Sequence, residues 1–251
     1  MDAQAIQNAA GLLVDARRTG TWLAALPASC QPASIDDAHA IQDATVAALG
    51  DAVAGWKIAA AADGAVMRGV LLRSQVVASP ARLPAARTPL LGVEAEIAFH
   101  FDRALPPRDR DYGYAEVAAA VTALPAIEVV DSRFTSYTGT PQLHRLADCM
   151  SNGAFVQGAP QPRWRDVDLA ALHVTLTIGG AAIVDRIGGH TTRDPLLPAL
   201  ALANHLRTRG GVAAGVVMTT GTYTGLNYAR PGQTVVAEFE GFGSAQVTFD
   251  A

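Results

Sequence analysis

The sequence predicts an α+β protein in which two N-terminal helices precede a β-rich body. Three observations lead to this fold class. Apolar residues recur at helical spacing in the first fifty residues. After Gly55, short apolar runs alternate with Gly, Pro and Asn turns. Only two further helix-like segments interrupt those runs, so strands make up most of the remaining chain.

Both N-terminal helices carry recognisable ends. The segment "AQAIQNAAGLLVDARRTG" has its apolar residues on one helical face and stops at Gly20. The segment "SIDDAHAIQDATVAALG" begins with Ser34, followed three residues later by Asp37, which predicts a capping box. Gly50 predicts its end.

The β-rich body is predicted from a series of short apolar runs and two helices. The helices are "YAEVAAAVTAL", ended by Pro125, and "DPLLPALALANHLRTRGG", with Asp194 as N-cap, Pro195 at the first position and Gly210 past its end. The last run predicts a hairpin with "EGFGS" as its turn. The other predicted strands lie in "GWKIAAA", "GVEAEIAFHF", "AIEVVDSRF", "GAFVQG", "HVTLTIGG" and "GVVMTTG".

Composition argues against several classes of protein. The 251 residues are 50% hydrophobic and 17% charged, which favours a folded core over disorder. The net charge is −4 and no basic cluster is present, so we expect no nucleic-acid partner. No signal-peptide pattern and no apolar run of membrane-spanning length occur. Cys30 and Cys149 form no CxxC pair, and we expect reduced thiols in a cytoplasmic protein.

Two glutamates stand one residue apart in the apolar run "GVEAEIAFHF". On a strand, Glu94 and Glu96 project from the same face, roughly 6.5 Å apart, while the apolar residues between and beside them face the core. Such a pair can bind one cation. The alternative is an amphipathic edge strand with a solvated polar face.

A second acidic strand favours the metal site. The run "ALPAIEVVDSRF" carries Glu128 and, three residues later, Asp131. These two point to opposite faces of a strand, so at most one joins the first pair without a bulge. Three carboxylates make an all-oxygen site, which suits Mg²⁺ or Mn²⁺.

Lys57 and a threonine-rich turn complete the candidate residues. Lys57 is the one lysine among 19 basic residues, the others being arginine, and it lies in the apolar run "GWKIAAA". We interpret it as a proton-transfer group; the alternative is a packed stem whose ammonium pairs a carboxylate. In "TTGTYTG", the hydroxyls of Thr220, Thr222 or Thr224 are candidates for binding a substrate carboxylate, and the alternative is a plain turn.

These motifs resemble a known family along nearly the whole chain, from about Leu12 onward. "GVEAEIAFHF", "LPAIEVVDSRF" and "GWKIA" resemble the fumarylacetoacetate hydrolase superfamily. "RTGTWLAAL", "DAHAIQ" and the ending "PGQTVVAEFEGFGSAQVTF" resemble its branch of 2-keto-4-pentenoate hydratases and 4-oxalocrotonate decarboxylases.

The resemblance implies a mixed β-sandwich-like roll of the fumarylacetoacetate hydrolase C-terminal-domain type with an N-terminal helical cap. We divide the chain at a soft boundary into a cap, residues 1–54, and a catalytic domain, residues 55–251. The resemblance also implies a homo-oligomer and a divalent metal. Glu94 and Glu96 match the E-x-E ligands, and Glu128 matches the third ligand of the hydratase branch. Asp131 stays the alternative, and Lys57 matches the active-site lysine.

The implied activity is that of a metal-dependent lyase on a 2-keto (2-hydroxydienoate) acid, most simply hydration of a 2-keto-4-pentenoate-type compound in aromatic catabolism. A decarboxylase of the 4-oxalocrotonate type and an acylpyruvate C–C hydrolase are alternatives. The chain departs from the family over residues 58–76, where alanines replace an expected glycine and Arg68 and Arg73 stand in a loop that commonly carries an acid. A non-catalytic metal-binding partner of an active paralogue therefore also stays open.

Overall fold

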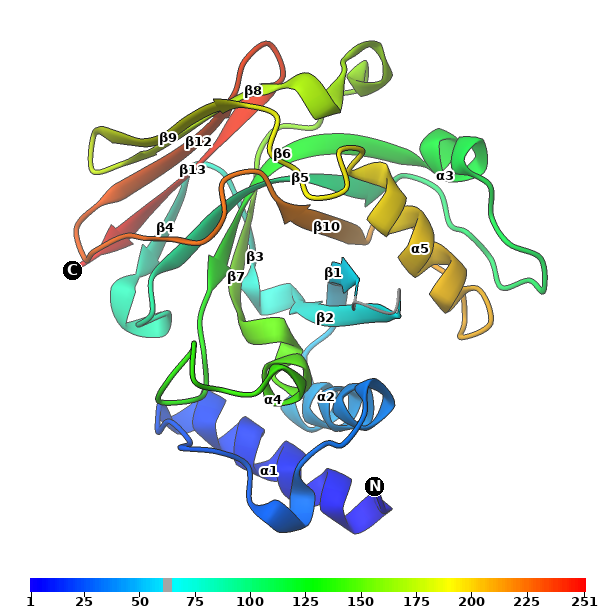
Figure 1. Ribbon diagram of the computed structural model, residues 1–251, viewed down its shortest axis with the longest axis vertical. Coiled ribbons are helices and arrows are strands. Elements are labelled where there is room, and N and C mark those ends of the chain that lie inside the picture. Colours follow the sequence, from blue (N-terminus) through cyan, green and yellow to red (C-terminus); the bar gives the residue numbers. More distant parts are fainter. Residues whose placement is uncertain (61–64) are drawn as a thin grey trace.

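Two sheets form the body of the protein, and helices lie at one end and along one flank (Figure 1). The structure, a computed structural model, describes residues 1–60 and 65–251. Helices α1, α2 and α4 gather at the end opposite the smaller sheet, while α5 and α3 lie along the flank. The helices are α1 (Ala3–Thr19), α2 (Ile35–Leu49), α3 (Tyr114–Ala120), α4 (Gln142–Ala147) and α5 (Leu196–Leu206).

The strands include long central ones and short ones at the edges. They are β1 (Val53–Ala60), β2 (Val66–Leu72), β3 (Val76–Ala78), β4 (Ala81–Pro84), β5 (Gly92–Phe101), β6 (Val121–Val130), β7 (Asn152–Gln157), β8 (His173–Ile178), β9 (Ala181–Ile187), β10 (Val217–Thr222), β11 (Asn227–Tyr228), β12 (Thr234–Phe239) and β13 (Gly243–Asp250).

The two N-terminal helices end as their sequences predict. The side chain of Ser34 accepts a hydrogen bond from the Asp37 N–H at 3.1 Å. Gly20 and Gly50 end α1 and α2 in the left-handed conformation that glycine adopts without strain. Helix α1 packs on α2, and α2 packs on α4, in an apolar cluster that also contains Met67 and Phe134 from the body. The division into a cap and a catalytic domain stays a prediction.

The larger sheet carries the candidate site. Among the described residues, its strands follow the order β2-β1-β10-β5-β6-β7-β3, with β11 beside β5. Strands β5 and β6 are antiparallel and pair along their whole length. Strand β1 runs parallel to β10, which separates it from β5. Residues from β1, β5 and β6 can therefore meet on one face of this sheet.

The smaller sheet closes the core from the other side. Its order is β4-β13-β12-β8-β9, and β12 and β13 form the predicted hairpin. Val93, Ala95, Ile97, Phe99 and Phe101 of β5 are buried and belong to the main apolar cluster, as their alternation predicts. The same cluster contains residues of β8, β12 and β13, so the two sheets share one core.

Two predictions of local structure were wrong. The segment "YAEVAAAVTAL" is helical only to Ala120, and β6 then continues through Pro125. A strand buried on both faces reads as a continuous apolar run, which the helical period also fits. Proline is tolerated there because β7 pairs with β6 only from Ala126 onward. The predicted loop at 58–76 contains the end of β1 and the whole of β2, and its residues 61–64 lie outside the described residues. The start of α5 agrees with its sequence: Pro195 has helical backbone angles, and Asp194 accepts a hydrogen bond from the Leu196 N–H at 2.9 Å.

Within the described ranges, no helix is long and apolar enough to cross a membrane. Cys30 and Cys149 are both buried and form no disulfide.

Candidate active site

Three glutamates meet on adjacent strands. Glu94 and Glu96 lie on β5, and Glu128 lies on β6 directly opposite Glu94 in the register. One carboxylate oxygen from each residue lies within 4.8 Å of the other two. Glu96 and Glu128 are 2% and 1% exposed, so water does little to solvate their charges.

Two groups on β10 hold Glu96 in place. The Thr219 hydroxyl donates a hydrogen bond to Glu96 Oε2, and the Gly221 N–H lies 3.4 Å from the same oxygen. This contact follows from the sheet order, because β10 is the neighbour of β5.

Lys57 lies beside the third glutamate. Its side chain on β1 donates to Glu128 Oε1 and, at 3.0 Å, to the Met150 carbonyl. The Asn152 amide lies 3.4 Å from the same Glu128 oxygen. Both the proton-transfer interpretation and the ion-pair alternative for Lys57 are compatible with this position.

The acidic cluster carries more negative charge than its surroundings neutralise. Burial, with the nearby Glu128 charge, raises the pKa of Glu94 to about 7 and that of Glu96 to about 8. Burial lowers the pKa of Lys57, but the charges of Glu128 and Glu94 outweigh it and the net shift is upward. A bound cation would relieve the repulsion among the three carboxylates.

These residues line a cavity of about 740 Å³. One wall is apolar and includes Ile58, Val66, Met67, Leu146 and Leu197. The polar part includes the three glutamates and Lys57, together with Tyr137, Arg145, Ser151, Thr220 and Thr222. The cavity thus combines an acidic floor with room for a small organic molecule.

The threonines of the predicted substrate turn do not share one environment. Thr220 and Thr222 line the cavity, whereas Thr224 does not. The Thr220 hydroxyl donates to the Ile97 carbonyl at 3.0 Å, and the Thr224 hydroxyl accepts from the Ala95 N–H at 3.1 Å.

Asp131 follows the end of β6 and lies apart from the acidic cluster. Its carboxylate accepts from the Leu90 N–H at 3.1 Å and lies 3.4 Å from the Arg133 guanidinium. It does not line the cavity that holds the three glutamates. His100 also lies apart, with its ring bonded to Asp102 at 2.9 Å.

Several residues in the cavity were not singled out from the sequence. Tyr137, Arg145 and Ser151 line it from segments that follow β6. The Ser151 hydroxyl is buried and has no hydrogen-bond partner among the described residues. No local pattern marks these residues, because only the return of the chain over the sheet brings them to the glutamates.

Comparison with known proteins gives relatives over the full length. The chain is 29% identical over 260 residues to a 2-keto-4-pentenoate hydratase of Paraburkholderia phymatum, covering 99% of this chain and 98% of the relative. It is 29% identical over 134 residues to a 4-oxalocrotonate decarboxylase of Pseudomonas putida, covering 53% and 50%. No family model matches the chain.

Among solved structures, the 4-oxalocrotonate decarboxylase of Pseudomonas putida G7 in complex with magnesium and adipate superposes with a TM-score of 0.86. The match covers 99% of this chain and 98% of that chain at 22% identity. The chain thus has the fold of the fumarylacetoacetate hydrolase superfamily, as the sequence motifs indicate. Its homologues include proteins named 2-keto-4-pentenoate hydratase and 4-oxalocrotonate decarboxylase.

Proposed function

We propose that this protein is a divalent-metal-dependent lyase that hydrates a 2-keto-4-pentenoate-type compound in aromatic catabolism. The observation that carries this proposal is the cavity in which three glutamates and the chain's one lysine meet beneath an apolar wall. The full-length similarity to a 2-keto-4-pentenoate hydratase supports it. The cytoplasmic location and the homo-oligomeric state stay predictions.

Glu94, Glu96 and Glu128 are the proposed metal ligands, and Mg²⁺ or Mn²⁺ is the proposed ion. The donor set is entirely carboxylate oxygen, which hard divalent cations prefer. The excess of buried negative charge gives a further reason for a cation there. When bound, the ion would supply positive charge for the carboxylate and carbonyl oxygens of a 2-keto acid.

The protein's own side chains have distinct tasks in this proposal. Lys57 holds a proton next to the acidic floor and is the proposed acid and base for the proton transfers that accompany addition of water. Thr220 and Thr222 are the proposed substrate contacts, and Thr224 supports their turn through Ala95. The apolar wall excludes bulk water from the conjugated chain of the substrate.

One observation favours a second candidate, decarboxylation of a 4-oxalocrotonate-type dicarboxylate. Arg145 lines the cavity beside Tyr137, with its guanidinium carbon 5.2 Å from the ring centroid. Within the described parts of the chain, no carboxylate forms an ion pair with Arg145 at 4 Å or less. A second carboxylate on the substrate would supply that partner.

An activity assay separates the candidates. With Mg²⁺ or Mn²⁺ present, the hydratase should remove the dienol absorbance of a 2-hydroxypentadienoate without releasing CO₂. A decarboxylase should release CO₂ from the dicarboxylate, and an acylpyruvate hydrolase should form pyruvate. Metal binding without turnover of any of these substrates would favour the non-catalytic partner.

Thermal denaturation tests the metal site independently of the substrate. Mg²⁺ or Mn²⁺ should raise the melting temperature, because the ion binds the native state. The double variant Glu94→Gln with Glu96→Gln should lose that rise. Glu238→Gln with Glu240→Gln is a matched control, because these exposed glutamates have the same spacing on the β12–β13 hairpin. An unchanged rise in the first double variant would overturn the ligand assignment.

A further inference from the structure

A turn of unusual backbone conformation lies against the candidate site. Cys149, Met150 and Ser151 have φ angles of 51°, 53° and 59°. All three are in the left-handed region, which L-residues avoid because their Cβ atoms crowd the backbone. Such conformations persist only where the surrounding structure holds them, and they cluster at functional sites.

This turn contacts Lys57, the proposed acid and base, and the residue after it contacts Glu128, a proposed metal ligand. The Met150 carbonyl accepts a hydrogen bond from Lys57 at 3.0 Å. The Asn152 amide, directly after the turn, lies 3.4 Å from Glu128. Between them, Ser151 lines the cavity. The path of the turn therefore sets where Lys57 and Glu128 find their partners.

The turn also packs tightly against the stem of Lys57. Gly69 lies opposite Lys57 in the β1–β2 register. A Cβ atom on Gly69 would lie 2.6 Å from the Cys149 carbonyl oxygen and 2.7 Å from Lys57 Cγ. Glycine at this position lets the turn approach the lysine so closely.

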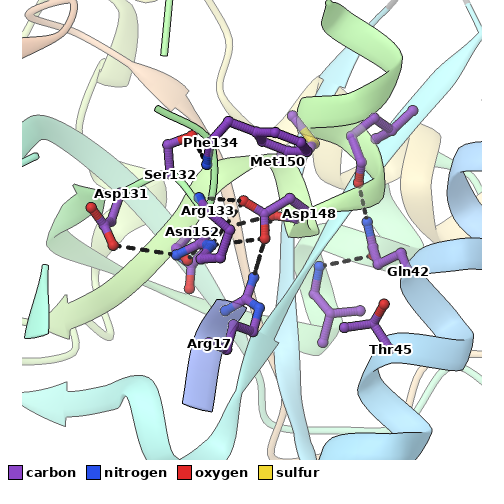
Figure 2. A network of polar contacts seen from close by, with 12 residues as sticks. Arg17, Gln42, Thr45, Asp131, Ser132, Arg133, Phe134, Asp148, Met150 and Asn152 are labelled. Atoms are coloured by element: carbon purple, nitrogen blue, oxygen red, sulfur yellow. Dashed lines mark hydrogen bonds and ion pairs between the residues drawn. The ribbon is translucent and has the colours of Figure 1, made fainter. Parts of the chain in front are cut away.

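Two arginines hold the turn at its ends (Figure 2). Asp148, which is fully buried, precedes the turn and lies between them. Arg17 from α1 donates to Asp148 Oδ1 at 2.8 Å. Arg133 Nε lies 2.8 Å from both oxygens of Asp148, and Arg133 Nη2 donates to the Asn152 carbonyl at 2.9 Å. Arg133 thus joins the residue before the turn to the residue after it.

We propose that Arg17 and Arg133 are positioning residues, which through Asp148 hold the left-handed turn in the path that orients Lys57 and Glu128. The proposal rests on the proposed function, because it assigns the turn's contacts a role in that site. It extends the working part of the site to the N-terminal helix α1, whose residues do not touch the cavity that holds the glutamates. A network that served stability alone would not affect how Lys57 is held.

Arg17→Met is the informative variant. It removes one partner of Asp148 and leaves the two contacts from Arg133, so the buried carboxylate stays paired. Arg18→Met is the matched control, since Arg18 lies on the same last turn of α1 and is exposed, with one bond to the Ala48 carbonyl. Arg17→Lys is the conservative variant. Arg17 reaches the Asp148 carboxylate through Nη2 alone, so an ammonium group can replace that contact.

Two measurements read out the position of Lys57. An amine reagent can modify only Lys57 and the N-terminus, and mass spectrometry of the peptides separates them. In metal-free protein, Arg17→Met should speed modification of Lys57 relative to wild type, while Arg18→Met should not. With metal and substrate, Arg17→Met should lower kcat by about 10- to 100-fold with a smaller change in KM. Arg17→Lys should restore most of the loss in both measurements.

The outcomes are distinguishable. If Arg17→Met lowers only the melting temperature, and its Lys57 modification rate and kcat equal those of Arg18→Met, the network is structural and the proposal is wrong. If Arg17→Met does not fold, Arg17→Gln carries the same comparison. If wild type turns over no 2-keto acid, the proposed function fails. The modification rates then still decide whether α1 controls the turn.

Discussion

At the scale of single residues, the main feature of the candidate site is an excess of negative charge. Three glutamates, of which Glu96 and Glu128 are buried, face one lysine, so the metal-free site holds more acid than base. Protons on Glu94 and Glu96, whose pKa values rise to about 7 and about 8, reduce part of this negative charge. A divalent ion would replace those protons, and the exchange ties metal binding to pH.

This exchange predicts the pH dependence of the metal-free protein. Glu94 and Glu96 have pKa values of 4.5 in the unfolded chain and higher values in the folded one. Between these values the folded state binds more protons, so stability falls as pH rises. We expect the melting temperature of metal-free protein to fall from about pH 5 to about pH 8, and the rise caused by Mg²⁺ to grow over the same range.

The double variant Glu94→Gln with Glu96→Gln supplies the control for this titration, since it removes both groups. Asp37 and Glu116 have lowered pKa values and therefore titrate below this range. A wild-type melting temperature that stays constant between these pH values, or a slope that is equally steep in the double variant, would contradict the prediction.

Lys57→Arg separates proton transfer from ion pairing. Arginine keeps the positive charge and can still pair with Glu128, but it does not release a proton near neutral pH. We therefore expect kcat to fall by roughly 100-fold or more, measured by loss of dienol absorbance. The Mg²⁺-dependent rise in melting temperature should persist in this variant, which would show that the metal site is intact. Full activity in this variant would end the assignment of Lys57 as acid and base.

Site residues that alternate along a strand could be predicted from the sequence. Site residues that reach the glutamates only through the folding of the chain over the sheet could not. Glu94 and Glu96 follow from alternation on one strand, and Glu128 from a second acidic strand. Arg145 and Ser151 come from α4 and the turn after it, and no spacing relates them to β5. Thr219, which the sequence did not single out, donates to Glu96, although the register pairs Thr219 with Ala98 and Thr222 with Glu96. The register shifts between these two threonines, and alternation along one strand does not predict such an irregularity.

At the scale of elements, the helices with caps and the alternating strands were predictable. Ser34, Gly20 and Gly50 mark their helix ends by local chemistry. The first half of β6, residues 121–125, was assigned to a helix because the strand is buried on both faces and reads there as an apolar run. Strand β9 was missed because, at the sheet edge, it is almost entirely exposed. In both cases the position of the strand in the folded protein, and not its local sequence, determined which residues are buried.

The left-handed turn makes a prediction about stability. Ser151 has a φ of 59° and a buried hydroxyl without a partner in the described structure. Glycine removes both costs, of which the backbone part is about 1 kcal/mol. Ser151→Gly should therefore raise the melting temperature by about 2–4 °C. It should lower kcat, because the cavity loses a hydroxyl and the turn loses rigidity.

Ser151→Ala provides the comparison, since it removes the hydroxyl but keeps the Cβ atom that crowds the left-handed backbone. Calorimetry of the two variants isolates the backbone contribution. A Ser151→Gly protein that melts no higher than Ser151→Ala would show that the turn is not under strain.

At the scale of the whole molecule, the smaller sheet leaves one edge open. Strand β9 pairs with β8 and, among the described strands, with no other. Ile183 and Ile187 of this strand are 51% and 74% exposed. An exposed apolar edge strand invites pairing with another chain, and natural monomers normally protect such edges.

We therefore predict a homo-oligomer whose contacts include β9. Light scattering should give at least twice the chain mass of 26.0 kDa. Ile183→Lys with Ile187→Lys should reduce that mass, because two ammonium groups cannot be buried in an apolar contact without partners. Trp22→Lys, which changes another exposed apolar residue far along the chain from β9, is the control for general effects of surface charge. A wild-type protein that is a clean monomer would refute oligomerisation, whereas an oligomer unaffected by the isoleucine changes would place the interface elsewhere.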